Sequence, residues 1–429
     1  MNYRELLINS FRAALAAADP LIIVPPHLPM PPTGRTLVVG AGKAAAAMAK
    51  AVETAWPQTA PLSGVVITRY AHGYSGSEAL SRIRVLEAGH PVPDAAGESA
   101  AAEILALASA LTADDLLLVL VSGGGSSLLS LPAVGLAMAD LKAVTSALLQ
   151  SGAPIQEMNV VRKHLSAIQG GRLAAATRAQ VVALIISDVA GDDPSAIASG
   201  PTSADPSTYQ DALDILTRYG IVPPLAVLRH LSNGVRGDIA ESVKPGDAIF
   251  ARVENKLIAT AHRSLTRAAA FFQAQGITPI IIGDSVTGEA REVAKVHAAF
   301  ARQIKTHHHP FKPPVAIISG GECTVTLRTA GVGRGGRCSE FLLSLAIDLD
   351  AVENIFALAC DTDGIDGSEA NAGAYLEPGT LSRARLGEVD AKALLAANDA
   401  YGFFEPLDGL IFTGPTRTNV NDYRVILVL

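Results

Sequence analysis

Residues 38–45 read VVGAGKAA, in which an apolar run passes through two glycines into an alanine-rich stretch. The glycines allow a tight turn, and a helix that starts there presents unpaired N–H groups to an anion. Similar apolar runs recur along the chain, most of them ending in glycine, and helical lengths of Ala- and Leu-rich sequence separate them. The runs are 36–39, 64–68, 116–121, 181–187, 277–282, 315–319 and 355–360, and the clearest helical stretches are 44–54, 257–275 and 339–348. Continuous apolar strands that alternate with helices predict an α/β protein whose parallel sheets are covered on both faces.

The composition excludes several classes of protein. The chain has 429 residues, of which 49% are hydrophobic and 17% are charged, so it has ample material for packed cores and too little charge for disorder. Its net charge of −7 argues against a nucleic-acid-binding surface, which needs clustered positive charge. The longest apolar runs are far shorter than the roughly 20 residues that span a bilayer. The 3 cysteines lack C-x-x-C spacing, which excludes a disulfide scaffold and favours a reducing compartment. We therefore predict a soluble, cytoplasmic protein with no nucleic-acid or membrane partner.

The alternating pattern is interrupted between residues 223 and 245, where prolines and glycines accumulate before a new helical and apolar sequence begins near Asn255. Such a stretch is typical of a domain boundary. We predict an N-terminal domain over residues 1–240, with a Rossmann-like, doubly wound sheet that is mostly parallel. A smaller C-terminal α/β domain is expected over residues 241–429.

Two further glycine-rich loops follow predicted strands and are candidates for binding phosphate. The first is Ser122-Gly123-Gly124-Gly125-Ser126-Ser127, where successive glycines can turn several N–H groups inward as an anion-binding nest. Three adjacent glycines cost considerable backbone entropy, which favours a functional loop over a merely structural one. The second, Ser319-Gly320-Gly321-Glu322, repeats this arrangement.

Carboxylates gather after two other predicted strands. Asp188 follows the run at 181–187, at the position where open α/β sheets build their sites. The segment Asp361-Thr362-Asp363-Gly364-Ile365-Asp366-Gly367 holds carboxylates that repel one another unless a cation or an arginine is near. It lacks the ligand pattern of an EF-hand, and its sparse oxygen donors suit Mg²⁺ shared with a nucleotide. The alternative is an acidic turn without a metal.

Basic residues near these loops have more than one interpretation. Lys43 lies inside the first turn, where it fits a phosphate contact or a surface lysine. Arg69 stands where dinucleotide folds place an acidic residue for the ribose, which leaves a phosphorylated dinucleotide open. Arg337 precedes a helix after Gly333-Arg334-Gly335-Gly336, and its planar fork suits phosphate or carboxylate. The run Arg162-Lys163-His164 either lines a cleft or lies on the surface.

Several segments together resemble the type II glycerate kinase family, whose C-terminal part is called the MOFRL domain and whose members are often labelled hydroxypyruvate reductases. In chain order the segments are VVGAGKAAAAMA, LVSGGGSSLL, NVVRKHLSAIQGGRLA, ISDVAGDDPSAIASGPT, SGGECTVTL, GRGGRCSEFLLSLA, DTDGIDG, NDAYGFF and TGPTRTNVND. The resemblance covers nearly the whole chain in the order of the family. It implies ATP- and Mg²⁺-dependent transfer of a phosphoryl group to D-glycerate, in a cleft between two α/β domains, with 2-phosphoglycerate as the favoured product.

The resemblance also assigns roles to residues. The active-site lysine, aspartate and arginine of the family fall on Lys43, Asp188 and Arg337. We expect Lys43 and Arg337 to stabilise phosphoryl charge or anchor the carboxylate, in a crevice that is locally basic, and Asp188 to deprotonate the attacking hydroxyl group. The SGGGSS loop together with Gly320, Gly321 and Glu322 is expected to bind ATP, and Asp363 and Asp366 are expected to hold Mg²⁺.

This sequence departs from the family at three positions. Cys338 and Ser339 stand where similar members carry Asn-Gln, and Arg417 stands where glycine is usual. These departures concern substrate preference and fine geometry more than the class of reaction.

Two other functions compete with the kinase. An NADP-dependent hydroxypyruvate reductase is motivated by Gly40-Ala41-Gly42 and Arg69, but one dinucleotide groove gives no reason for the SGGGSS and DTDGIDG segments. A non-catalytic sensor of phosphorylated sugars would use the anion-binding loops without an acidic cluster. D-glycerate and ATP are the expected partners, and a homodimer is left open.

Overall fold

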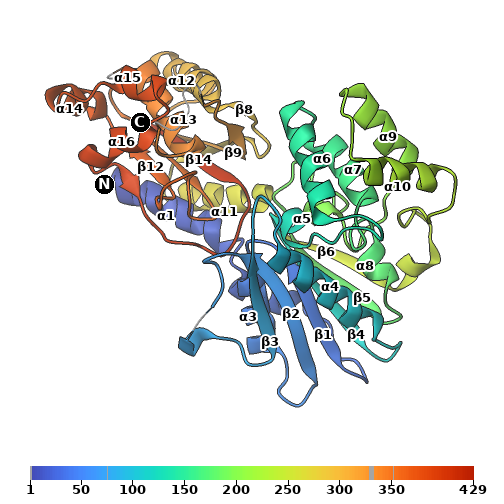
Figure 1. Cartoon of the computed structure of the whole chain (residues 1–429). Helices are drawn as coiled ribbons and strands as arrows, with labels where there is room; N and C mark the ends of the chain where they lie inside the picture. Colours follow the sequence, from blue (N-terminus) through green and yellow to red (C-terminus); the bar gives the residue numbers. More distant parts are fainter. Residues whose placement is uncertain (1, 75, 328–332, 351) are drawn as a thin grey trace. The chain divides into compact units, whose positions relative to one another are not determined.

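The computed structural model describes residues 2–74, 76–327, 333–350 and 352–429. The chain forms two compact units, which we call the central unit (Pro20–Ile258) and the terminal unit (Met1–Asp19 with Ala259–Leu429). Each unit contains a sheet and its own apolar core (Figure 1).

The central unit is built on a sheet with the strand order β3-β2-β1-β4-β5-β6. The ladders that join β3, β2, β1, β4 and β5 are all parallel. The order reverses its direction between β1 and β4, as in doubly wound folds. The strands are β1 (Thr36–Ala41), β2 (Leu62–Arg69), β3 (Ile83–Ala88), β4 (Leu116–Val121), β5 (Gln180–Ile186) and β6 (Val253–Ala259).

Both faces of this sheet are covered, because β1 and β4 are buried along their whole length. Alternate residues of β1 pack with α4 in one core, and a separate apolar cluster joins α6, α7, α9 and α10. The helices of this unit are α2 (Pro20–Ile23), α3 (Ala45–Ala55), α4 (Ala95–Ser109), α5 (Gly125–Leu128), α6 (Met138–Gln150), α7 (Ile155–His164), α8 (Arg172–Ala175), α9 (Tyr209–Arg218) and α10 (Leu225–Val235). The predicted α/β class and the doubly wound, parallel sheet are confirmed.

The terminal unit has a second sheet, with the order β13-β12-β11-β14-β9-β7, and a short parallel pair of β8 and β10. Its strands are β7 (Thr278–Gly283), β8 (Gly288–Glu289), β9 (Val315–Gly321), β10 (Cys323–Thr324), β11 (Ile355–Asp361), β12 (Gly373–Leu376), β13 (Leu410–Ile411) and β14 (Asp422–Val428). Its helices are α1 (Tyr3–Ala16), α11 (Ala261–Ala274), α12 (Ala290–His307), α13 (Arg337–Leu349), α14 (Thr380–Leu386), α15 (Ala391–Ala396) and α16 (Ala400–Phe404).

Helices cover the two faces of this second sheet as well (Figure 1). Val315 and Ile317 of β9 pack in the core that contains α12 and α13. Their neighbours Ala316 and Ile318 pack in the core that contains α1 and α11. The continuous apolar sequence of β9 follows from this burial on both faces.

The expectation of parallel strands is wrong for most of the second sheet. β14 pairs antiparallel with both β9 and β11, and β12 pairs antiparallel with β11 and β13, so that only the β7–β9 ladder is parallel among the described pairs of this sheet. Antiparallel neighbours need no helical crossover. The chain between β11 and β12 is indeed a loop and not a helix.

The two compact units differ from the predicted domains at both ends. The predicted boundary at residues 240 and 241 falls before β6, which adds to the edge of the central sheet next to β5. Helix α1 belongs to the terminal unit, where Phe11 stacks on Tyr423 with ring centroids 5.7 Å apart and the Tyr423 hydroxyl contacts the Ser10 hydroxyl at 2.8 Å. The sequence of α1 is amphipathic, and this pattern does not indicate which of the two cores the helix will cover.

Within the part of the chain that the structure describes, no single helix combines the length and apolar composition of a membrane span. Tyr3–Ala16 and Pro20–His27 meet these criteria only when taken together, and the two are bent by 43°.

Candidate active site

Three predicted site segments follow neighbouring parallel strands of the central unit. Ala41 of β1 is in register with Val121 of β4, and Val121 is in register with Ile185 of β5. Lys43, the SGGGSS loop and Asp188 come directly after these aligned strand ends, at the edge where open α/β sheets bind ligands. The reversal of strand order lies between β1 and β4, so the Lys43 turn and the SGGGSS loop flank the switch point. The structure therefore brings these segments to one edge of one sheet.

The Lys43 turn and the SGGGSS loop hold each other through backbone contacts. The Lys43 N–H donates to the Gly123 carbonyl at 2.8 Å, and the Ala44 N–H donates to the Ser122 hydroxyl at 3.0 Å. Gly42 has a φ of +141°, and a Cβ there would collide with Ser122. The fully buried Ser122 side chain thus caps the start of α3, which is a structural task beside its predicted part in nucleotide binding.

The glycines of this loop have packing reasons that the sequence does not reveal. Gly124 has a φ of +81°, and a Cβ on it would lie 2.8 Å from the His90 ring and 3.6 Å from the Lys43 Cγ. A Cβ on Gly125 would lie 2.5 Å from the Cβ of Ala198. The loop, the Lys43 side chain and the segment around His90 are therefore closely packed. Backbone entropy alone does not distinguish a phosphate cradle from this packing.

The two serines at the end of the loop, Ser126 and Ser127, carry hydroxyl groups that are partly accessible to solvent. The Ser126 hydroxyl lies 2.9 Å from the Ser199 hydroxyl, and the Ser127 hydroxyl donates to the Gly124 carbonyl at 3.1 Å. Both side chains are partly exposed, unlike Ser122, and both line a pocket.

In the terminal unit, Arg337 is the centre of a network of ion pairs at the start of α13. Its Nε contacts Asp422 at 2.7 Å, its Nη2 contacts Asp361 at 2.6 Å and its Nη1 contacts Glu322 at 3.0 Å. Burial alone would lower the pKa of the guanidinium, but Asp422, Asp361 and Glu322 outweigh it and raise that pKa. The locally basic surroundings expected at Arg337 are thus not found, because three carboxylates surround it.

Sequence reasoning missed Asp422 and Arg424, which complete this network. Arg424 is 1% exposed, donates to the second oxygen of Asp422 at 2.7 Å, and lies with its guanidinium carbon 5.5 Å from the Phe341 ring centre. The two residues are two positions apart in the apolar strand β14, so both side chains point to the same face of the sheet. A charged pair at this spacing in an otherwise apolar strand is the signal that could have revealed them.

Gly320 and Gly321 lie against the same network. Arg424 donates to their carbonyl groups at 3.2 and 3.1 Å, and a Cβ on Gly321 would collide with the backbone of Val286. Glu322 is the exposed partner of Arg337. These contacts explain the glycines by close packing, and the nucleotide contact predicted for them stays a prediction.

Asp366 caps α13. Its two carboxylate oxygens accept hydrogen bonds from the Cys338 N–H at 2.9 Å and from the Ser339 N–H at 2.8 Å, and the Ser339 hydroxyl donates to it as well. A carboxylate at these positions satisfies orphan N–H groups of the first helical turn. Ser339, one of the departures from the family, therefore takes part in the cap.

The two carboxylates expected to hold Mg²⁺, Asp363 and Asp366, both accept hydrogen bonds within the fold. Asp366 is fully buried with both oxygens engaged by α13, and an oxygen of Asp363 accepts the Ile365 N–H at 2.9 Å. Among the described residues, no group of three His, Cys, Asp or Glu side chains is arranged to hold a metal ion. The engaged oxygens of Asp366 argue against it as a Mg²⁺ ligand, and the Mg²⁺ contact expected of Asp363 stays a prediction.

Arg417 occupies a position with a backbone φ of +57°, in the left-handed region that glycine adopts without strain. A side chain there costs roughly 1–2 kcal/mol. Glycine, which the family resemblance predicts at this position, would adopt this backbone without that cost.

The capping carboxylate predicts a dependence of stability on pH. Burial raises the pKa of Asp366 from its ordinary 3.8 to about 6, against hydrogen bonds from Ser339 and Cys338 that lower it. The folded protein then prefers the protonated form, so the contribution of Asp366 to stability is full below about pH 4 and is lost as the pH rises through about 6. Relative to the Asp366→Asn variant, the wild type should lose on the order of 2–3 kcal/mol of unfolding free energy across this window. Urea unfolding of both proteins at a series of pH values measures this, and parallel pH profiles would contradict the assignment.

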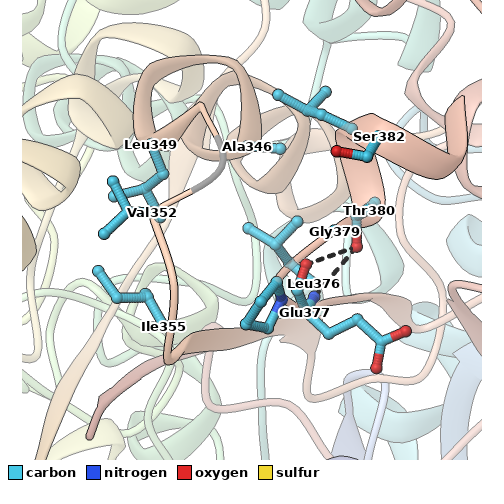
Figure 2. Close-up of a pocket in the computed structure, with 11 residues that line it drawn as sticks. Ala346, Leu349, Val352, Ile355, Leu376, Glu377, Gly379, Thr380 and Ser382 are labelled. Carbon is cyan, nitrogen blue, oxygen red and sulfur yellow. Dashed lines mark hydrogen bonds between the residues drawn. The ribbon is translucent and has the colours of Figure 1, made fainter. Parts of the chain in front are cut away.

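Figure 2 shows a pocket in the terminal unit that is not part of these sites. The Thr380 hydroxyl donates to the Glu377 carbonyl at 2.8 Å and accepts from the Glu377 N–H at 3.2 Å. Most of the other lining is apolar, and none of the predicted site residues belongs to it. The lining residues are Ala346, Leu349, Val352, Ile355, Leu376, Glu377, Pro378, Gly379, Thr380, Leu381 and Ser382.

Comparison with known proteins places this geometry in a family. The model of a domain of unknown function, DUF4147, matches residues 6–232, and the MOFRL family model matches residues 315–422. A protein of Agrobacterium vitis named "Putative hydroxypyruvate reductase" is 50% identical over 99% of this chain and 94% of its own length. The glycerate 2-kinase of Pyrococcus horikoshii is 38% identical over 92% of this chain and 88% of its own length.

A solved structure agrees over the whole chain. The crystal structure of a glycerate kinase from Thermotoga maritima covers 100% of this chain and 99% of its own, with a TM-score of 0.88 at 36% identity. Kinases thus appear both among the similar sequences and among the similar structures. The chain belongs to the glycerate kinase family that joins a DUF4147 domain to a MOFRL domain.

Proposed function

We propose that this protein is a glycerate 2-kinase, which transfers the γ-phosphoryl group of ATP to the 2-hydroxyl group of D-glycerate. The likeness to the glycerate kinase of Thermotoga maritima over 100% of this chain carries the proposal. The convergence of Lys43, the SGGGSS loop and Asp188 on one sheet edge supports it, because phosphoryl transfer depends mainly on positioning and charge neutralisation.

The roles in the central unit follow from the chemistry of the side chains. The Lys43 ammonium neutralises negative charge on the transferring phosphoryl group, and the hydroxyl groups of Ser126 and Ser127 donate to phosphate oxygens. Asp188 orients the attacking hydroxyl group and accepts its proton. The Lys43 backbone is fixed by its bond to Gly123, so its side chain starts from a defined position.

Arg337 is proposed to bind an anionic group of the substrates in the terminal unit. Asp361 and Asp422 are buried and hold two of its nitrogens, whereas the Glu322 side chain is 54% exposed. Glu322 is therefore the carboxylate that an incoming phosphate or carboxylate group can replace. Asp361 and Asp422 keep the guanidinium in its orientation, and Nη1 exchanges the Glu322 carboxylate for an anionic group of the substrate.

Mg²⁺ enters the proposal only as part of the substrate MgATP. A Mg²⁺ that arrives on substrate phosphates needs few protein ligands. No step is assigned to a metal held by Asp363 and Asp366, since one oxygen of Asp363 accepts within the turn and both oxygens of Asp366 serve the α13 cap.

The proposal is tested by two assays on the purified protein. With D-glycerate, ATP and Mg²⁺, we expect ADP formation that requires glycerate, and phosphorus NMR of the product should show 2-phosphoglycerate. With hydroxypyruvate and NADPH, we expect no loss of nicotinamide absorbance. Reductase activity without kinase activity would overturn the proposal, and so would a protein inactive in both assays.

A further inference from the structure

Three successive basic residues end helix α7, and only two of them have acidic partners. Lys163 contacts Asp205 at 3.4 Å, and His164 contacts Glu241 at 3.2 Å. Arg162 is partly buried between elements of the central unit, yet within the part of the chain that the structure describes no carboxylate or carbonyl group pairs with its guanidinium. Burial lowers the pKa of Arg162, and no nearby group opposes that shift.

The Arg162 side chain lines a pocket at the exposed end of the SGGGSS loop. The cavity has a volume of about 40 Å³, which admits a small oxyanion group and not a whole substrate. Its polar lining residues include Ser126, Ser127 and Ser130. The full lining is Pro91, Pro93, Ser126, Ser127, Ser130, Leu141, Val144, Thr145, Arg162, Leu165 and Gln169.

Arg162 and three hydroxyl groups are among the polar groups that line this pocket. Arg162 offers N–H groups in a planar fork and accepts nothing. The Ser127 hydroxyl donates to the Gly124 carbonyl at 3.1 Å and the Ser130 hydroxyl to the Met138 sulfur at 4.0 Å, so each has to rotate about its C–O bond to donate to an anion. Gln169 does not compensate the charge, because its amide group donates to the carbonyls of Ser126 and Leu129 at 2.9 and 3.1 Å. A partly buried cation that shares a pocket with hydroxyl groups, and that has no carboxylate partner among the described residues, favours the binding of an anion.

We propose that Arg162, with the hydroxyl groups of Ser126, Ser127 and Ser130, forms a binding site for an oxyanion group of a substrate, a carboxylate or a phosphate. An arginine fork binds two oxygens of either group at once. The identity of the anion rests on the proposed function, in which the sources are the carboxylate of D-glycerate and the phosphates of ATP. Arg162 is thereby a residue that determines substrate binding and is not assigned to the chemical step.

The test compares Arg162→Met, which keeps the length of the side chain and removes its charge, with Arg162→Lys and with a control. Arg229 on α10 is exposed and serves as the matched control in the variant Arg229→Ala. Isothermal titration at constant ionic strength measures the binding of D-glycerate, of ATP and of inorganic phosphate to each protein. Melting temperatures without added anion report on folding.

We expect Arg162→Met to weaken the binding of at least one probe about 10- to 100-fold, with Arg162→Lys in between and Arg229→Ala unchanged. A loss confined to D-glycerate identifies the carboxylate, and a loss confined to ATP and phosphate identifies the phosphate. Without anions, Arg162→Met should melt at or above the temperature of the wild type, because an uncompensated charge has been removed.

Three results would overturn the site: wild-type affinity of Arg162→Met for all three probes, no binding of any probe to the wild type, or a lower melting temperature of the variant as its only change. Failure of the kinase assay is a separate result. If the wild type does not phosphorylate D-glycerate, the titration with inorganic phosphate still decides whether Arg162 binds an oxyanion.

Discussion

Replacing Lys43 by alanine is expected to lower kcat for the phosphorylation of D-glycerate about 10²- to 10³-fold, with little change in stability. The ammonium group is proposed to stabilise charge that develops on the transferring phosphoryl group. The backbone N–H of Lys43 donates to Gly123 at 2.8 Å, and this contact is retained in alanine. The melting temperature of the variant therefore reports on the side chain alone.

Steady-state kinetics with D-glycerate and MgATP measure the effect, and circular dichroism and the melting temperature check the fold. Lys142 on α6 has a partly exposed side chain in the same unit and provides the control variant Lys142→Ala, which should retain the kcat of the wild type. A kcat of Lys43→Ala within about twofold of the wild type would remove Lys43 from the mechanism. A large loss of stability in the variant would show that the side chain has a structural role instead.

The sequence predicts the central unit well because its signals are local. The runs at 36–39, 116–121 and 181–187 are apolar except for Thr36 and Ser187 at their ends. This pattern indicates strands buried on both faces, and the runs form β1, β4 and β5 side by side. The terminal sheet is less predictable, because strand direction depends on partners that are distant in sequence. β14 lies between β9 and β11, and nothing in its own seven residues specifies that place.

In the candidate site too, the features with local sequence signals are predictable, and those that depend on residues distant in sequence are not. Lys43 and the SGGGSS loop could be brought together from the sequence, because parallel strands place their carboxyl ends at one edge. For the acidic segment, carboxylates close in sequence predict a cation or an arginine nearby, and they leave open both Mg²⁺ and a turn without a metal. The structure shows that Asp361 faces Arg337 and that Asp366 faces the start of α13. These partners come from other elements, so no spacing within the segment could reveal them.

Removing the Arg337 guanidinium is expected to destabilise the terminal unit by about 3–5 kcal/mol in addition to lowering turnover, because the variant Arg337→Ala leaves buried carboxylates without their cation. Asp361 and Asp422 are 3% and 1% exposed and accept from Arg337 at 2.6 and 2.7 Å. Arg424 also contacts Asp422, so Asp422 keeps one cation in the variant, whereas Asp361 loses the guanidinium that contacts it at 2.6 Å. The charge left on Asp361 should therefore account for much of the loss.

Urea unfolding followed by hydrogen exchange of the amides in β11 and β14 reports on this unit separately. If uncompensated charge is the cause, the double variant Arg337→Ala/Asp361→Asn should be more stable than Arg337→Ala by about 1 kcal/mol or more. The control Arg385→Ala removes an ion pair with Asp350 in which both side chains are more than 60% exposed (65% and 62%), and it should cost less than about 1 kcal/mol. Equal losses of unfolding free energy in Arg337→Ala and Arg385→Ala would mean that the network does not stabilise the fold.

Strictly additive effects of Arg337→Ala and Asp361→Asn on the unfolding free energy would mean that the two side chains are not coupled, whatever their distance. Because lost stability can lower activity by itself, the turnover of Arg337→Ala is to be compared with that of the more stable double variant, in which the anion-binding guanidinium is equally absent.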